Sequence, residues 1–237
     1  MKKKIDLIVL CGGLGTRLRS VNKNNPKILV QIDKNNTFLD YFLKNINQPL
    51  IRKVILSLGY KKKKVIKYVE KKFSDVVNIK FSSEEKQLGT GGAIKNTLNN
   101  LDVTDPFFVI NGDTFFKVDF KKIFKIYLEK KKSLILLTKS LEIKRFDQFK
   151  TFKHKIYKIR KKNSNTYFIN SGLYLFKKKD FNLNKFFFSI ENDVLENLIE
   201  KDKLIFYKNR SKIFFDIGIP KTLNKFKKYI KSRNDKR

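Results

Sequence analysis

Apolar and polar residues follow two different patterns along residues 1–140. Short runs such as IDLIVL (5–10) and SLILLT (133–138) are almost entirely apolar, which is typical of strands buried on both faces of a sheet. Longer segments such as FLDYFLKNI (38–46) repeat their apolar residues at helical spacing. The pattern predicts strands at 5–10, 53–60, 78–83, 106–113 and 133–138, and helices at 38–46, 63–73, 91–101 and 119–132 with Asp119 as N-cap. We therefore expect an α/β fold in which helices cover both faces of a mainly parallel sheet.

The pattern changes in residues 141–230. Strands with alternating polarity are predicted at 155–160, 167–176, 203–208 and 212–219, and helices near 191–201 and 220–231. We interpret this part as a mixed extension of the same sheet that holds a substrate pocket. A basic tail, KSRNDKR (231–237), follows. Neither an internal repeat nor a flexible linker divides the sequence, so residues 1–237 are predicted to form a single domain.

The formal net charge of +33, taken alone, favours a nucleic-acid partner or an anionic surface. However, the lysines are spread along the whole chain and accompany many Asn, Ile and Phe residues, with Ala93 as the single alanine. An AT-rich coding sequence would impose this composition on any protein. The sequence also contains no helix-turn-helix, RRM or zinc signature. We expect no nucleic-acid partner, although the charge would attract phosphorylated substrates.

The chain start, MKKKIDLIVLCGG, imitates a secretory signal, because lysines precede an apolar run and a cysteine. The run after Asp6 is only LIVL, shorter than the roughly 7–15 apolar residues that a signal requires. Leu10 precedes Cys11 where a lipoprotein cleavage site needs a small residue. No stretch approaches the ~18–20 apolar residues of a membrane span. A single cysteine forms no internal disulfide, so the sequence predicts a cytoplasmic protein without a membrane partner.

The stretch LCGGLGTRL (10–18) places three glycines directly after the first predicted strand. A loop at the carboxyl end of such a strand is where ligands bind in α/β sheets. The dinucleotide fingerprint G-x-G-x-x-G does not fit, because Arg17 and Leu18 stand where its last glycine would lie. The Walker sequence G-x-x-x-x-G-K-[ST] is absent, and the protein-kinase loop lacks its H-R-D and D-F-G partners.

What remains is Gly-Gly-x-Gly-Thr-Arg-Leu (12–18), followed by Pro26 and Lys27. In order, spacing and strand context, this sequence resembles the signature of the sugar-1-phosphate nucleotidyltransferases, the enzymes that make nucleotide-sugars. The resemblance implies a Rossmann-like fold of the nucleotidyltransferase type. It also implies that residues 1–140 bind the nucleotide and that residues 141–230 bind the sugar phosphate.

The resemblance implies that the partners are a nucleoside triphosphate and a sugar 1-phosphate. Because the attacking phosphate oxygen is already ionised, the enzyme has to position the reactants and neutralise charge, without a general base. Arg17 would grip the triphosphate and Lys27 would place a charge at its α-phosphate, while glycine amides donate to phosphate oxygens. Together with Asp113, these two residues are the expected catalytic residues. The expected nucleotide-binding residues are Leu10, Gly12, Gly13, Gly15, Thr16, Leu88, Gly89, Thr90 and Gly112.

In the resembled family, the segment EEKQLGTGGAIK (84–95) lines the nucleobase, and its L-G-T stretch faces the base. Gly91 and Gly92 would then start a helix close to the nucleotide. The alternative is a glycine helix start that contacts no ligand.

The resemblance also implies Mg²⁺ as a cofactor. The sequence NGD (111–113) ends a predicted strand and FFDIGIP (214–220) lies late in the chain, and the family's metal ligands correspond to Asp113 and Asp216. Two carboxylates together with phosphate oxygens and water suit Mg²⁺. Either aspartate alone is equally compatible with an ordinary turn.

The run INSGLYLF (169–176) resembles the strand at the family's sugar pocket. Asn170 is expected to bind sugar hydroxyls, and Gly172 to leave room for the sugar ring. Glu191, in the FSIE stretch, is either a further sugar-phosphate-site ligand or a helix-start residue.

The sugar half also departs from the family pattern. The usual E-K pair is replaced by YKIRKKNS (157–164), so Lys161, or else Lys162 or Arg160, is expected to bind the sugar phosphate. Asp147 stands where the family has the glycine of a Y-G pair. A carboxylate there is unfavourable beside a phosphate unless it points away, and altered sugar specificity or reduced activity would follow.

Several further motifs resemble the D-glycero-D-manno-heptose 1-phosphate guanylyltransferase branch, namely LSLGYK, LGTGGAI, NGDTFF, NSGLYLF, FSIE and DIGIP. This resemblance implies GTP as donor and a role in surface polysaccharide synthesis. The same chemistry with UTP, CTP or dTTP and a hexose 1-phosphate is an alternative. A basic nucleic-acid-binding protein, or a relative that only binds nucleotide, are two others. The sequence leaves the oligomeric state open, a homo-oligomer included.

Overall fold

One large sheet organises the fold, and the computed structural model describes residues 4–18, 20–22, 25–73, 78–139, 145–159 and 168–235. The strands are β1 (Ile5–Leu10), β2 (Ile51–Leu58), β3 (Ile79–Ser83), β4 (Phe107–Asn111), β5 (Thr114–Phe116), β6 (Ser133–Thr138), β7 (Gln148–Phe152), β8 (Lys155–Ile159), β9 (Phe168–Phe176), β10 (Leu204–Lys208) and β11 (Phe214–Asp216). The helices are α1 (Phe38–Ile46), α2 (Lys62–Phe73), α3 (Gly89–Asn100), α4 (Phe120–Lys130), α5 (Leu195–Glu200) and α6 (Pro220–Asn234).

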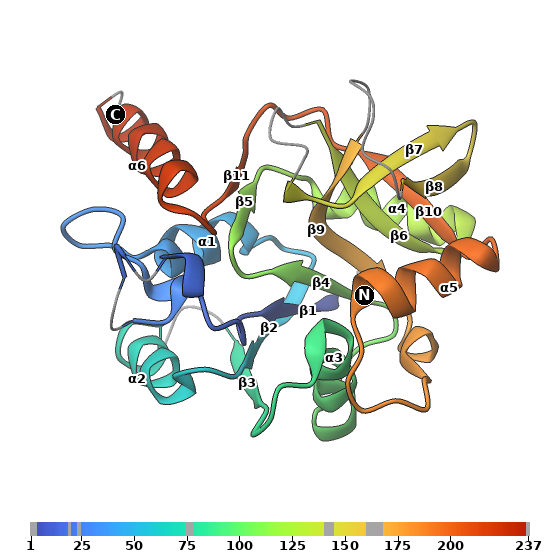
Figure 1. The fold of residues 1–237 in the computed structure, drawn as a ribbon, viewed down its shortest axis with the longest axis horizontal. Coiled ribbons are helices and arrows are strands. Elements are labelled where there is room, and N and C mark those ends of the chain that lie inside the picture. The colour runs from blue at the N-terminus through green and yellow to red at the C-terminus, as the bar shows by residue number, and fades with distance from the viewer. Residues whose placement is uncertain are drawn as a thin grey trace.

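The main sheet is mainly parallel, as predicted. Its strand order is β10-β6-β9-β4-β1-β2-β3, with a hairpin of β7 and β8 attached to β9 (Figure 1). The neighbours β1–β2, β1–β4, β2–β3 and β6–β10 are parallel. In this row of strands, β9 alone runs antiparallel to its neighbours, β4 and β6.

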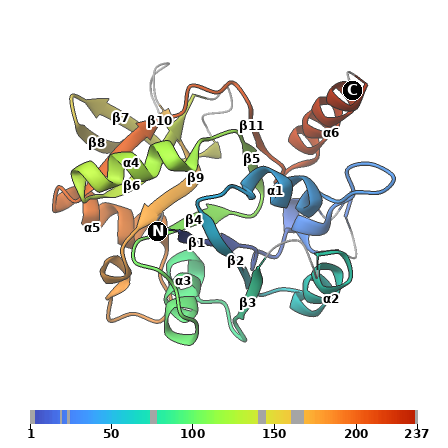
Figure 2. The same ribbon diagram turned by 180° about the vertical axis from the view of Figure 1, so that it is seen from behind.

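Helices cover both faces of the sheet (Figures 1 and 2). Residues of α1, α2, α4 and α6 share one hydrophobic cluster with Leu7 and Val9 of β1, whereas residues of α3 and α5 share the other cluster with Ile8. Successive side chains of a strand point to opposite faces, so a strand covered on both sides must be apolar throughout. None of the helices in the described ranges has the length and apolar character that crossing a membrane requires.

The predicted helices of the first half are confirmed, with small shifts at their ends. Helix α1 occupies the predicted residues, and α4 starts directly after Asp119. The Asp119 carboxylate accepts hydrogen bonds from the backbone N–H groups of Lys121 (2.9 Å) and Lys122 (3.3 Å). This side chain is therefore the helix cap that the sequence predicts.

The second half is a mixed extension of the same sheet, as predicted, because it adds both antiparallel and parallel pairs. Strand β9 lies between β4 and β6, and its residues 169–176 are buried. The predicted strand at 212–219 is reduced to β11, which pairs with β5 in a separate two-stranded sheet. Strands β5 and β7 are not predicted, because such short strands are defined by their distant partners and show little periodicity of their own.

A buried ion pair lies at the amino ends of β1 and β2. Asp6 is fully buried and accepts hydrogen bonds from Nε (2.8 Å) and Nη2 (2.7 Å) of Arg52. It also accepts one from the backbone N–H of Thr104 (3.0 Å), and Lys53 Nζ lies 3.7 Å away. The hydrogen bonds to Asp6 raise the pKa of the Arg52 guanidinium. This ion pair stabilises the side of the sheet where β1 and β2 begin, which is opposite the carboxyl ends of these strands.

The variant Arg52→Met should lower the free energy of unfolding by about 1–3 kcal/mol, because the buried Asp6 carboxylate would lose both hydrogen bonds from the Arg52 guanidinium. Chemical denaturation followed by circular dichroism measures this loss. The matched control is Arg210→Met at an exposed position, which should change the stability by less than about 0.5 kcal/mol. Equal losses in the two variants would contradict the stabilising role of the pair.

Candidate functional site

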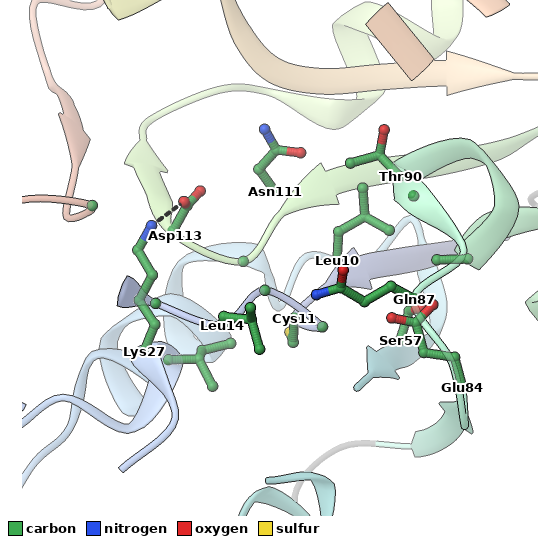
Figure 3. Close-up of a pocket in the computed structure, with 18 of the residues that line it drawn as sticks. Leu10, Cys11, Leu14, Lys27, Ser57, Glu84, Gln87, Thr90, Asn111 and Asp113 are labelled. Atoms are coloured by element: carbon green, nitrogen blue, oxygen red, sulfur yellow. Dashed lines mark hydrogen bonds and ion pairs between the residues drawn. The ribbon is translucent and has the colours of Figure 1, made fainter. Parts of the chain in front are cut away.

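A pocket of about 500 Å³ opens at the carboxyl ends of the central parallel strands (Figure 3). Leu10 and Asn111 are the last residues of β1 and β4, and Ser57 lies one residue before the end of β2. This edge is where α/β sheets bind ligands, because the strands end together there and loops continue from them. The pocket is lined by Leu10, Cys11, Gly12, Gly13, Leu14, Gly15, Thr16, Arg17, Lys27, Ile28, Ser57, Glu84, Gln87, Gly89, Thr90, Ala93, Asn111, Gly112, Asp113, Phe187 and Gly218.

The structure brings the three expected catalytic residues and most of the expected nucleotide-binding residues together around this pocket. Those that line it are Leu10, Gly12, Gly13, Gly15, Thr16, Arg17, Lys27, Gly89, Thr90, Gly112 and Asp113. Arg17 lies in a 3-10 turn (Thr16–Leu18), and its side chain is exposed to solvent. The role of each residue toward a ligand stays a prediction.

The glycines in the loop after β1 are required for different structural reasons. Gly15 has φ +61°, a left-handed conformation that favours glycine, and it packs against the side chain of Lys27. A Cβ added at Gly12 would lie 3.0 Å from Oε1 of Glu84. By contrast, a Cβ added at Gly13 would meet no atom of the described chain within 4 Å. Backbone conformation and packing therefore explain Gly15, and packing explains Gly12. The open space in front of Gly13 lets a ligand approach its backbone.

Charged groups gather at one end of the pocket. Lys27 Nζ forms an ion pair with Asp113, and Asp216 accepts a hydrogen bond from the backbone N–H of Gly218 (2.5 Å). A Cβ added at Gly218 would lie 3.0 Å from Lys27 Nζ and 2.6 Å from Asp216 Oδ1. Burial, and then repulsion by Asp113, raise the pKa of the Asp216 carboxyl, while Lys27 and Arg145 oppose this rise. The two predicted metal ligands are therefore close enough to repel each other.

The small β5–β11 sheet brings these two carboxylates together. Thr114, directly after Asp113, is paired with Asp216 in the antiparallel register. The backbone N–H of Ile217 also donates to the carbonyl of Asp113 (2.9 Å). Because strand pairing fixes neighbouring backbones, two acidic side chains that are distant in the sequence are held at one place.

Arg145 is a residue at this end that the sequence does not identify. Its Nη2 lies 3.3 Å from Asp216 Oδ2, and its side chain is 22% exposed. The guanidinium stands over the ring of Phe146 at 5.5 Å, and that ring packs edge-on against Phe214 of β11. The sequence draws attention to Asp147 in the same stretch, but carries no local signal that Arg145 reaches β11.

Polar groups of a different kind lie at the other end of the pocket, where Figure 3 shows Glu84, Gln87 and Ser57 together. Glu84 directly follows β3, and its Oε2 atom is buried without a hydrogen-bond partner in the described chain. Burial raises the pKa of the Glu84 carboxyl, while a hydrogen bond from the Leu88 backbone opposes the rise. Glu84 and Gln87 belong to the stretch expected at the nucleobase, but the sequence does not identify either of them as a binding residue.

The structure places the following residues of this stretch differently with respect to the pocket. Leu88 is not among the pocket-lining residues, and its carbonyl accepts a hydrogen bond from the backbone N–H of Phe188 (3.1 Å), so its contact with the base stays a prediction. The helix expected to start at Gly91 and Gly92 starts two residues earlier, at Gly89 on the pocket wall, and these two glycines of its first turn face the segment around Phe188. A side chain at Gly91 would overlap the Phe188 ring. These glycines are needed for packing between distant parts of the chain.

The expected sugar-binding residues that can be described do not line the pocket. The Asn170 amide donates to the Tyr174 hydroxyl (2.6 Å) and accepts from the backbone N–H of Gly172 (2.9 Å). Gly172 has φ +77°, and the Asn111 side chain occupies the space where its Cβ would lie. Sugar binding by Asn170 and room for the sugar ring at Gly172 stay predictions.

Glu191 lies in a π-helical turn (Ile190–Val194) that precedes α5, so it is a helix-start residue, as one of the two readings expects. Its Oε2 accepts a hydrogen bond from Thr90 Oγ1 (3.0 Å), which links this turn to the pocket wall. Burial raises the pKa of the Glu191 carboxyl. The other hypothesis, that Glu191 is a ligand in the sugar-phosphate site, stays a prediction.

Asp147 faces a positive charge. Its carboxylate lies 3.8 Å from Nζ of Lys158, which also donates to Asn192 Oδ1 (2.8 Å) and to the carbonyl of Glu191 (3.1 Å). The lysine therefore offsets a carboxylate that the resembled family does not have. Lys161, and its alternatives Lys162 and Arg160, lie outside the described residues.

Comparison with known proteins agrees with this geometry. The chain is 36% identical over 231 residues to a D-glycero-alpha-D-manno-heptose 1-phosphate guanylyltransferase of Aneurinibacillus thermoaerophilus, covering 95% of this chain and 98% of the relative. It is 34% identical to an enzyme of the same name from Campylobacter jejuni, covering 90% and 94% of the two chains.

Solved structures point the same way. The crystal structure of HddC from Yersinia pseudotuberculosis complexed with GMP-PN superposes with a TM-score of 0.80 at 31% identity, covering 95% of this chain and 99% of that one. The inositol-1-phosphate CTP transferase from T. maritima shares the fold with a TM-score of 0.71 at 17% identity, covering 95% and 94%. The profile of the nucleotidyl transferase family matches residues 7–233. The chain therefore belongs to the nucleotidyl transferase family.

Proposed function

We propose that this protein transfers a guanylyl group from GTP to D-glycero-D-manno-heptose 1-phosphate. An oxygen of the sugar phosphate attacks the α-phosphorus of GTP, the bond to the β-phosphate breaks, and GDP-heptose and pyrophosphate result. The observation that carries the choice of base is the buried, unpartnered carboxylate oxygen of Glu84 in the pocket. The relatives named above support the choice of sugar.

The charged end of the pocket suits the phosphates of both substrates. The attacking phosphate is ionised before it binds, so the protein contributes position and positive charge. The Cβ of Lys27 lies beside Gly15 of the glycine loop and its Nζ beside Gly218 and Asp113, so Lys27 is the proposed cation for the α-phosphate. Arg17, on the exposed rim of the pocket, is the proposed cation for the outer phosphates. The backbone N–H groups at Gly12 and Gly13 complete this anion site.

We propose Mg²⁺ as the metal of this site, with Asp113 and Asp216 as its protein ligands. The donor set fits, because two carboxylates converge there and repel each other, and a divalent cation between them would remove the repulsion. Among the described residues, no group of three or more His, Cys, Asp or Glu side chains is gathered. Two carboxylates suffice for Mg²⁺, which takes its other ligands from phosphates and water. When bound, Mg²⁺ would neutralise charge on the phosphates.

The end of the pocket that contains Glu84, Gln87 and Ser57, here called the base end, favours guanine. The guanine edge carries two adjacent donors, N1–H and the N2 amino group, and an ionised carboxylate offers only acceptors. Uracil and thymine present one ring N–H flanked by two carbonyl oxygens, which would face the carboxylate unfavourably. A buried group that pairs with one base and is left unpaired by another gives strong discrimination. Glu84 therefore favours GTP over UTP and dTTP.

The product would supply surface polysaccharide synthesis, and the cytoplasm is the proposed compartment because the sequence contains a single cysteine. The same transfer from UTP, CTP or dTTP to a hexose 1-phosphate is the alternative with the same mechanism. A basic nucleic-acid-binding protein would bind DNA with a steep salt dependence and without response to GTP.

The direct test measures pyrophosphate release with Mg²⁺ while GTP, UTP, CTP and dTTP are each combined with heptose, mannose and glucose 1-phosphates. We expect release with GTP and the heptose, and loss of release when EDTA removes the metal. Release with another pair only would retain the mechanism and refute the proposed substrates. Absence of release with every pair would refute the proposed function.

The variant Glu84→Gln should lower kcat/KM for GTP by roughly 10–100-fold, because a hydrogen bond to a charged group contributes about 1.5–3 kcal/mol. The preference for GTP over UTP should shrink by a similar factor, since the amide offers only one acceptor. Glu85→Gln is the matched control, because the neighbouring Glu85 is exposed and pairs with Lys62. An unchanged preference in Glu84→Gln would show that Glu84 does not read the base.

The variant Asp113→Asn should reduce pyrophosphate release by at least roughly 100-fold, because one of the two proposed Mg²⁺ ligands would lose its negative charge. The melting temperature should change little, since the side chain is partly exposed at the pocket. Asp235→Asn, at an exposed position near the end of α6, is the control and should retain full activity. Turnover equal to that of the unmodified protein would remove Asp113 from the proposed metal site.

A further inference from the structure

Two neighbouring phenylalanines are unusually exposed beside the pocket. Phe186 is 92% exposed and Phe187 is 67% exposed, whereas the next residue, Phe188, is buried. Of these three, Phe187 lines the pocket. Exposed apolar surface at a groove is typical of ligand-binding sites, and the Phe187 ring offers such a surface at the pocket.

The backbone of this segment is held firmly against the start of α3. The Phe188 carbonyl accepts hydrogen bonds from the N–H groups of Gly91 (3.0 Å) and Gly92 (3.2 Å). A Cβ added at Gly92 would lie 2.5 Å from the carbonyl oxygen of Phe186. The absence of side chains at these glycines thus allows the segment to approach the helix, and the approach fixes Phe187 in place.

This anchoring also decides what the start of α3 can bind. Its N–H groups at Gly91 and Gly92 already donate to the Phe188 carbonyl, so they are not available to a phosphate. The phosphate-binding groups lie at the other end of the pocket, around Lys27 and Asp113. The ligand group expected next to Phe187 is therefore the nucleoside rather than the phosphates.

Phe187 lies at the base end of the pocket. The backbone N–H of Phe188 donates to the carbonyl of Leu88, which follows Glu84 and Gln87 in the same lining segment. Among the described residues that line the pocket, Phe187 is the single aromatic one. Glu84 and Gln87 supply polar atoms for the edge of a base, and Phe187 supplies an apolar surface for its face.

We propose that the Phe187 ring stacks on the purine of the bound nucleotide. This inference rests on the proposed function, because it takes the pocket to be a nucleotide site. Stacking on an aromatic side chain contributes to the binding of every base, since each base has a π-face. Phe187 therefore contributes affinity for the nucleoside, while Glu84 decides which base is preferred.

Binding of GTP, UTP and inorganic tripolyphosphate to the full chain tests this assignment, measured by calorimetry with Mg²⁺ present. Phe187→Ala should weaken GTP binding roughly tenfold or more, and UTP binding in proportion, because stacking is lost for either base. Binding of tripolyphosphate, which has no base, should be unchanged. Phe187→Tyr keeps the ring and should bind GTP as the unmodified protein does.

Phe186→Ala is the matched control, because Phe186 is the more exposed neighbour and does not line the pocket; it should leave GTP binding unchanged. The inference is overturned if Phe187→Ala binds GTP normally, if Phe186→Ala loses as much, or if tripolyphosphate binding falls equally. An unmodified protein that binds no nucleotide overturns it as well. Nucleotide binding without pyrophosphate release refutes only the proposed function, since the stacking is still measured by the same variants.

Discussion

Two mutually repelling carboxylates lie at one end of the pocket, and a two-stranded sheet holds them together. Asp113 follows β4 and Asp216 ends β11, and the pairing of β5 with β11 joins their backbones. Burial and repulsion raise the pKa of Asp216, so this arrangement is unfavourable unless positive charge is near. Lys27 and Arg145 provide that charge from two different segments. Under the proposed function, a metal ion and phosphates would take over the role that these ion pairs have in the free protein.

The pocket separates two tasks along its length. Under the proposed function, the charged groups at the Lys27 end would act on phosphates that every nucleoside triphosphate shares. A buried acceptor and an aromatic ring at the Glu84 end would act on the base. Because the two ends lie on loops from different strands of one sheet, a change of base preference would not require a change of the reacting groups.

Local patterns predict the parts of this structure that depend on local interactions. Apolar runs identify β1 and β6, helical spacing identifies α1, and the glycine-rich loop after β1 lies at the pocket as predicted. The sequence does not predict which of Glu84 and Glu85 turns a carboxylate oxygen inward, since that depends on where β3 ends. It also leaves open what Gly91 faces, because a glycine at a helix start shows the same local pattern whether a ligand or a distant Phe188 approaches it. The insertion of β9 depends on partners far along the chain.

The position of β9 governs the order in which the molecule can be assembled. In the described sheet, β6 is bordered by β9 and β10, and β4 is bordered by β1 and β9. When synthesis has reached β6, β4 and β6 each have one edge that is unpaired until β9 is made. Unpaired strand edges can associate with other chains. At that point the chain holds the pocket residues of the first half, while Phe187, Gly218 and β9 are still to come. The two halves therefore depend on each other for folding, because the sheet that supports the pocket is complete only when β9 has paired with β4 and β6.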